Sequence, residues 1–160
     1  MAFGIFIDAP LLLIPFILFI KFRKQIANLI KKIRLPTFIL FLISSVPFII
    51  FEENINCGAF DCQYTFLPFT LYFLLGFLLI LGLIVKFTHT QKFFLTILLF
   101  SILGTIFEIF LGSSRVEFQA LPPLSFVLIS IWVMISYAFI SVVPLTILLE
   151  DKKAEKEKKR

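Results

Sequence analysis

Five long apolar runs, separated by short polar segments, restrict the folds open to this chain more than any other feature. Hydrophobic residues make up 60% of its 160 residues. Many of them gather in runs of about 20 residues, the length that a helix needs to cross a hydrocarbon core of about 30 Å. A water-soluble fold is excluded because too little polar surface would remain to cover the core. Membrane β-strands are disfavoured because they alternate polar and apolar residues, and these runs do not.

The chain is therefore predicted to be an all-α integral membrane protein, because helices satisfy their own backbone hydrogen bonds in lipid. One polytopic membrane domain is expected over residues 1–149, followed by a charged tail over residues 150–160. The predicted bundle has five transmembrane helices. They lie near residues 2–20, 35–51, 65–85, 93–111 and 124–149.

A basic amphipathic segment, residues 21–34, follows the first predicted span. Its apolar residues recur at helical spacing and basic residues flank them, a pattern typical of a helix lying in the headgroup layer. A helical extension of the first span would give the same pattern. We expect its basic side chains to anchor the chain at lipid headgroups, foremost Arg23, Lys24, Lys31 and Lys32.

The distribution of basic residues predicts the orientation. With five spans, all but one of the 15 Lys and Arg residues fall on one side of the membrane, and the exception is Arg115. The positive-inside rule then places the N-terminus outside and the C-terminus in the cytoplasm, as expected in a prokaryotic plasma membrane. Four spans would lose this segregation. The net charge of +5 is thus attributed to a face that meets the lipid bilayer, and no nucleic-acid partner is expected.

Both cysteines of the chain, Cys57 and Cys62, fall in the predicted outer loop after the second span. An oxidising exterior favours a disulfide between them. Their spacing is not the C-x-x-C of a redox pair, and no histidine lies nearby to complete a metal site. The sequence therefore predicts a structural disulfide, with neither a metal nor a cofactor.

Glu108 is the most informative single residue, because it lies about 15 residues, or about 23 Å, into the fourth predicted span. An ionisable group at such a depth usually faces the bundle interior. Ser101 and Thr105 share its helix face at 3–4 spacing and are expected to give it polar support. Glu108 is thus predicted to point at protein rather than at lipid.

Two further carboxyl groups, Glu52 and Glu53, end the second predicted span at the same membrane face. If spans two and four pack together, all three carboxyls converge on a candidate acidic site. Like charges so close together are typical of a proton relay, a cation site or an acid–base pair. Asn54 and Asn56 would add hydrogen-bond donors, and Arg115 is the expected charge partner.

No enzyme motif and no resemblance to a known family indicates the function. Trp132 and the face of the last span that carries Tyr137 are expected to serve packing. The first hypothesis is a non-catalytic subunit or stabiliser of a larger membrane assembly, acting with a membrane-protein partner or as a homo-oligomer. The second is a transporter or channel-like protein with a proton or cation site at the three glutamates. The third is an enzyme that uses the same carboxyls on a lipid or polyprenyl substrate.

Overall fold

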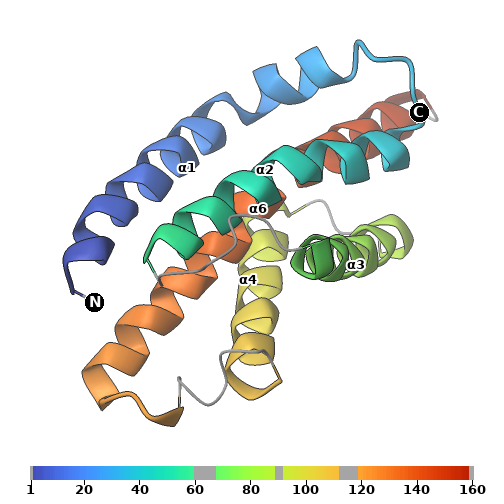
Figure 1. The fold of residues 1–160 in the computed structure, drawn as a ribbon. Helices are drawn as coiled ribbons and strands as arrows, with labels where there is room; N and C mark the ends of the chain where they lie inside the picture. The colour runs from blue at the N-terminus through green and yellow to red at the C-terminus, as the bar shows by residue number, and fades with distance from the viewer. Residues whose placement is uncertain (1, 60–67, 89–91, 112–118, 159–160) are drawn as a thin grey trace.

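All regular secondary structure in the described part of the chain is helical. A computed structural model describes residues 2–59, 68–88, 92–111 and 119–158, with side chains described over 10–56, 71–88, 92–111 and 119–151. The prediction of an all-helical protein is confirmed. The helices, drawn in Figure 1, are α1 (Ala2–Ile30), α2 (Thr37–Ala59), α3 (Pro68–Phe87), α4 (Phe93–Phe110) and α6 (Pro123–Lys158).

Three of the described helices, α2, α4 and α6, are long and apolar enough to cross a membrane. The apolar stretch of α3, Leu71–Phe87, is slightly shorter. Exposed apolar side chains cover the outside of these helices, as on α4 at Leu98, Ile102 and Ile106. A surface of this kind suits hydrocarbon, and the protein is accordingly a membrane protein.

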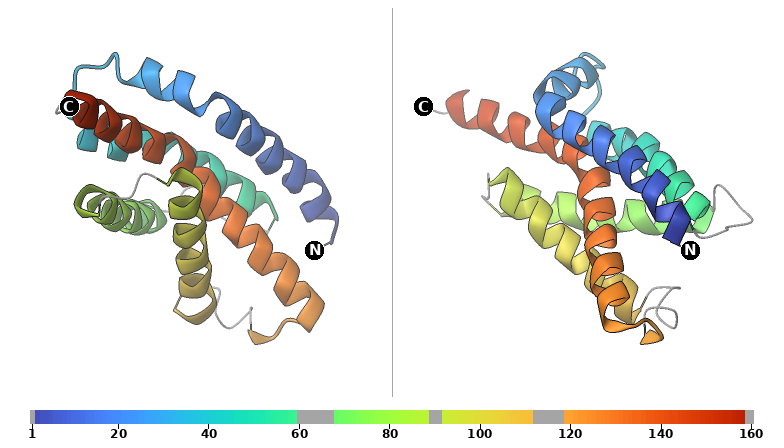
Figure 2. Two further views of the ribbon diagram at one scale, coloured as in Figure 1. Left: turned by 180° about the vertical axis from the view of Figure 1, so that it is seen from behind. Right: turned by 90° about the vertical axis from the view of Figure 1, so that its left-hand side faces the viewer.

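The central element of the bundle is α6, which packs against α1, α2 and α4. Figures 1 and 2 show it running the length of the molecule with the other helices around it. Residues 136–149 of α6 are all buried, as expected for a helix that is apolar on every side. By contrast, α2 and α4 share few contacts. Direct packing of spans two and four was the condition on which the three carboxyls were predicted to converge, and it is not met: α6 joins the two helices.

Two helix boundaries differ from the predictions. The first helix continues without a break to Ile30, so the basic segment begins as a helical extension of α1, one of the two arrangements consistent with the sequence. The second helix does not end at residue 51 but continues to Ala59. Its polar residues were predicted to form a loop. Instead, Glu52 and Asn56 bond each other one turn apart within the helix, which keeps this turn regular.

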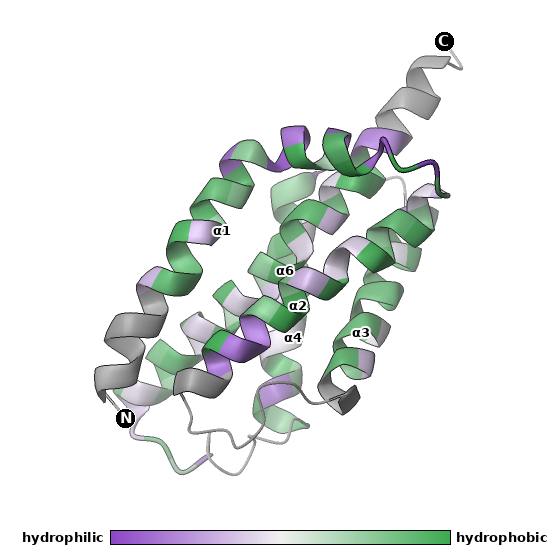
Figure 3. Ribbon diagram, turned by 45° about the horizontal axis from the view of Figure 1, so that its top comes forward, coloured by the Kyte–Doolittle hydropathy of each residue, from purple (hydrophilic) through white to green (hydrophobic). Residues whose placement is uncertain are grey.

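Three contacts gather the basic segments at one end of the bundle. The Thr37 hydroxyl donates a 2.8 Å hydrogen bond to Asp151, joining the start of α2 to the end of the apolar part of α6. Lys86, near the end of α3, lies 5.8 Å from the Phe38 ring. The Arg23 guanidinium of α1 lies 4.4 Å from the Phe93 ring of α4. We call this the basic end of the bundle, and Figure 3 shows the hydrophilic residues of α1 and α6 there.

Candidate functional site

Three polar residues on three different helices lie at one depth in the bundle. Each is 15 residues from the basic end of its helix, or about 23 Å at 1.5 Å per residue. They are Glu52, counted from Thr37; Glu108, counted from Phe93; and Ser136, counted back from Asp151. A hydrocarbon core is about 30 Å thick, so this depth lies well inside an apolar layer that starts at the basic end.

On α2, the Glu52 side chain is only 5% exposed. The Asn56 amide, one turn further along, donates a hydrogen bond to Glu52 Oε1. The Asn56 carbonyl oxygen in turn accepts a 2.9 Å hydrogen bond from Trp132 Nε1 of α6. Trp132, Asn56 and Glu52 therefore form one chain of hydrogen bonds that links α6 to α2 and fixes the orientation of the carboxyl group.

The Ser136 hydroxyl of α6 is a second polar group that faces this carboxyl. Ser136 lies one turn after Trp132 and is 3% exposed. Its hydroxyl interacts with the Glu52 carboxyl, although the geometry is looser than that of a normal hydrogen bond. The Ser136 hydroxyl is therefore a weak additional donor to this carboxyl.

On α4, Glu108 is held by Tyr137 of α6, whose hydroxyl donates a 3.1 Å hydrogen bond to Glu108 Oε1. The Tyr137 ring lies close against α4 at Gly104, where an added Cβ atom would come within 2.4 Å of the ring. The glycine is needed here because any larger side chain would occupy the space of the ring. This close approach sets where the Tyr137 hydroxyl meets the carboxyl group.

The three carboxyl groups are close enough to interact. Glu53 is half-buried and feels the charge of Glu108, and Glu52 feels the charges of both. Among the side chains that the structure describes, no Lys or Arg forms an ion pair with any of the three. We call Glu52, Glu53, Glu108 and their partners Asn56, Trp132, Ser136 and Tyr137 the acidic cluster.

Three other residues predicted for the site bond the backbone of their own helix and not the carboxyl groups. The Asn54 amide is exposed and donates to the Ile50 carbonyl. The Ser101 and Thr105 hydroxyls each donate to a backbone carbonyl of their own helix, at 2.8 Å. Neither hydroxyl is bonded to Glu108, because within an apolar layer a helical Ser or Thr readily bonds the carbonyl one turn back.

Several predictions fall on residues outside the described ranges. Arg115, the expected charge partner, lies there, and so does Cys62. The disulfide with Cys57 therefore stays a prediction, and Cys57 itself belongs to the last turn of α2. Of the expected headgroup anchors, Arg23 also bonds the Ile20 carbonyl at 2.8 Å. Lys24, Lys31 and Lys32 follow it on or just after α1.

The described side chains contain no group of three or more His, Cys, Asp or Glu residues arranged to hold a metal ion. The three carboxyls of the acidic cluster interact through space but do not form a coordination shell.

The α6 residues of the cluster, Trp132, Ser136 and Tyr137, were not predicted to take part in a site. One signal was present in the sequence: Trp N–H and Tyr O–H usually find a polar partner when buried, and both lie within a long apolar run. The spacing of Trp132 and Ser136 places them on one face of α6. The sequence alone does not reveal which carboxyls that face meets.

Comparison with known proteins gives no further indication, since no family model, no curated protein and no solved structure matches this chain.

Proposed function

We propose that this protein is a small transporter or channel-like membrane protein whose proton or cation site is the acidic cluster. The observation that carries the proposal is that Glu52 and Glu108 both meet side chains of α6, with Glu53 near enough to feel the charge of Glu108 and no described basic partner. Each charged side chain inside a membrane costs about 2.5–3.5 kcal/mol on insertion scales. The free-energy cost of placing three carboxyls together inside the membrane is lowest when a bound cation or proton neutralises them.

The hydrogen bonds of the cluster support a binding role. Trp132, Asn56 and Tyr137 hold two of the carboxyls in fixed orientations from two sides, and the Ser136 hydroxyl faces Glu52 as a further, weaker donor. A proton neutralises a carboxyl group without a coordination shell, which suits an arrangement that is not built as a metal site. We therefore favour a proton over a divalent metal ion.

The proposal includes a topology. The chain would cross a prokaryotic plasma membrane five times, with its N-terminus outside and its basic end in the cytoplasm. The gathering of basic segments at one end of the bundle supports this arrangement through the positive-inside rule. Labelling with a membrane-impermeant maleimide tests it. In a Cys62→Ser variant, which leaves Cys57 as a free thiol, Cys57 should react from outside intact cells, and a Lys31→Cys variant without the native cysteines should not; labelling of both from one side would refute the topology.

Flux measurements in vesicles test the function. The full chain is reconstituted into liposomes that contain a pH-sensitive dye, and a pH, Na⁺ or K⁺ gradient is imposed. Wild-type protein should speed the decay of at least one gradient, and Glu108→Gln should abolish this effect. Glu157→Gln, the same change near the end of α6, is the control and should leave the flux unchanged. Equal flux in the Glu108→Gln and control variants, or no wild-type flux under any gradient, would refute the proposal.

Such a refutation would favour the other roles expected from the sequence. A non-catalytic subunit or stabiliser would need the cluster only to hold α2, α4 and α6 together. It would co-purify with a membrane-protein partner in mild detergent. An outer-leaflet enzyme would need a lipid group to reach Glu108, and crosslinking of a photoreactive lipid to α4 or α6 near the cluster would support it.

A further inference from the structure

The acidic cluster lies much nearer to one end of the bundle than to the other. It is about 23 Å from the basic end, which leaves only about 7 Å of a 30 Å hydrocarbon core on its other side. On that side, where α2 and α4 end, Glu53 and Glu108 are only partly buried and Asn54 is exposed. Polar and partly exposed groups therefore lead from the cluster toward the end of the bundle opposite the basic end.

On the basic side of Glu52, three phenylalanine rings from α1, α2 and α6 pack against one another. Phe48 lies one turn from Glu52 on α2, and Phe139 lies one turn from Ser136 on α6, both toward the basic end. The Phe19 ring of α1 lies 5.0 Å from Phe48 and 5.6 Å from Phe139, and the latter two rings lie 5.9 Å apart. Phe139 is only 1% exposed. We call these three rings the aromatic layer, which fills the space between the three helices next to the carboxyl group.

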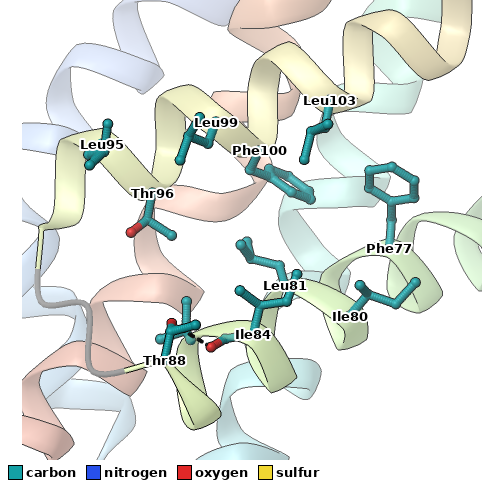
Figure 4. Close-up of a pocket in the computed structure, with 11 residues that line it drawn as sticks. Phe77, Ile80, Leu81, Ile84, Thr88, Leu95, Thr96, Leu99, Phe100 and Leu103 are labelled. Atoms are coloured by element: carbon teal, nitrogen blue, oxygen red, sulfur yellow. Dashed lines mark hydrogen bonds between the residues drawn. The ribbon is translucent and has the colours of Figure 1, made fainter.

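Aromatic rings also close the other side of α6. A cleft of about 360 Å³ lies between α3 and α4 on the basic side of the cluster, and Figure 4 shows the side chains that face each other across it. Its only lining side chains with polar atoms, Thr88 and Thr96, each donate to a carbonyl of their own helix. Where the cleft reaches Phe77 and Phe100, these two rings lie 5.8 Å apart, and they lie 6.1 and 5.7 Å from the Tyr137 ring. The cleft therefore offers no polar route to the cluster.

The buried hydroxyl groups on the basic side of the cluster do not form a path for protons. A hydroxyl passes a proton along only if it donates to the next group, and it has a single O–H. Six described hydroxyls in this region each donate instead to a carbonyl of their own helix, at 2.8–3.1 Å: Ser44, Ser45, Ser101, Thr105, Ser141 and Thr146. They therefore provide no hydrogen-bonded connection from the cluster to the basic end.

We infer that the acidic cluster exchanges protons only with the side of the membrane opposite the basic end, and that the Phe139 ring in the aromatic layer closes it toward the basic end. The described titratable groups that face the site are Glu52, Glu53, Glu108 and Tyr137. This access side rests on the proposed function and narrows it.

A site that is open on one side conducts no proton across the membrane until the aromatic layer opens. An apolar constriction blocks water and ions as long as it stays dry, and it conducts when it widens enough to be wetted. The arrangement is therefore that of a transporter, in which protons bind in one state and are released in another, rather than that of an open channel.

Sided changes of pH test the access side, with Trp132 as the reporter. Trp132 is the only tryptophan of the chain and is linked through Asn56 to Glu52, so its emission should change when protonation of that carboxyl alters these bonds. The full chain with Cys62→Ser is reconstituted into liposomes with a strongly buffered interior. Labelling of Cys57 by a membrane-impermeant maleimide gives the fraction of molecules whose Cys57 end faces outward. Glu52→Gln in the same background should abolish the response.

Acidification of the external buffer should change the emission of that labelled fraction alone. An ionophore that equalises the internal pH should then produce the rest of the change. A first change that matches the unlabelled fraction, or one that includes all molecules at once, would overturn the inference and leave the proposed function standing. An emission that follows pH from neither side would refute the cluster as a proton site, and the proposed function with it.

Phe139→Ala tests the closing ring. In this variant the emission of all molecules should change in one step, because protons reach the cluster through the opened layer from either side. Phe41→Ala is the matched control and should keep the two steps of the parent protein. Phe41 is as deeply buried as Phe139 (0% against 1%), but it packs against α3 at Gly82. Phe139→Leu is measured in the same way if Phe139→Ala does not fold. Two steps in the Phe139 variant, or one step in both it and Phe41→Ala, would overturn the role of the aromatic layer.

Discussion

Replacing Gly104 with Ala should disrupt the acidic cluster and leave the rest of the fold in place. The new methyl group would lie 2.4–2.6 Å from three atoms of the Tyr137 ring. The ring is rigid and both helices are held by other contacts, so the ring must move away from α4. Because the Tyr137 hydroxyl reaches Glu108 at 3.1 Å, even a small displacement breaks that hydrogen bond.

The expected loss of stability has two parts. Overpacking a well-packed contact costs about 1–3 kcal/mol, and an interhelical hydrogen bond in a membrane protein contributes about 0.6 kcal/mol. Ala in place of Gly returns up to about 1 kcal/mol through helix propensity. Gly76→Ala is the matched control, because no atom lies within 4 Å of its added Cβ. Since the control gains the same propensity, the two variants should differ by about 1.5–3.5 kcal/mol in free energy of unfolding.

Unfolding in mild detergent by titration with sodium dodecyl sulfate measures this difference. Trp132 is the only tryptophan of the chain and donates to Asn56 within the cluster, so its fluorescence reports on the relevant region. A difference between Gly104→Ala and Gly76→Ala below about 0.5 kcal/mol, the usual range of neutral substitutions, would refute the argument from close approach.

A double-mutant cycle with Tyr137→Phe identifies the lost hydrogen bond. In the wild-type background Tyr137→Phe removes the bond to Glu108 and keeps the ring. In the Gly104→Ala background the bond is already broken, so the same change should cost nothing further. Additive losses would mean that the bond survives the displacement.

The remaining predictions concern other contacts. Asn56→Ala should destabilise the protein by about 1–3 kcal/mol because it leaves the half-buried Trp132 N–H and the buried Glu52 carboxyl without their partner. Asn54→Ala, whose exposed amide bonds only its own helix, should cost less than about 0.5 kcal/mol, and thermal unfolding distinguishes the two. Gly82→Ala should also destabilise the fold, since its Cβ would lie 2.7 Å from the Phe41 ring. Addition of Phe41→Leu to Gly82→Ala should restore part of the lost melting temperature.

The helical class and most helix positions could be predicted because the requirements of lipid act locally. A run of apolar residues bounded by charges indicates a span wherever it occurs, and α3 and α4 begin and end within a few residues of the predicted positions. The end of α2 could not be predicted in this way. Glu52 and Asn56 are typical of a loop by composition, but they bond each other one turn apart, and Asn56 also bonds Trp132 of a distant helix.

The hydrogen-bond partners of each carboxyl depend on which helices are neighbours. The pattern of residues on each helix face does not reveal which helices those are. Glu108 shares a face with Ser101 and Thr105, yet these two hydroxyls bond their own backbone and Tyr137 of α6 supplies the donor. The sequence predicted convergence of the carboxyls only on the condition that spans two and four pack together. The long buried run of α6 lies between them, and its Trp and Tyr side chains provide the hydrogen bonds that the sequence pattern assigned to closer residues.

Tyr137 belongs to two environments at once. Its ring lies 6.1 Å from Phe77 of α3 and 5.7 Å from Phe100 of α4, while its hydroxyl holds Glu108. A change that moves the Tyr137 ring against these two phenylalanines therefore also moves its hydroxyl relative to the carboxyl group. One aromatic side chain thus ties the apolar packing of α3 and α4 to the orientation of an acidic group inside the bundle.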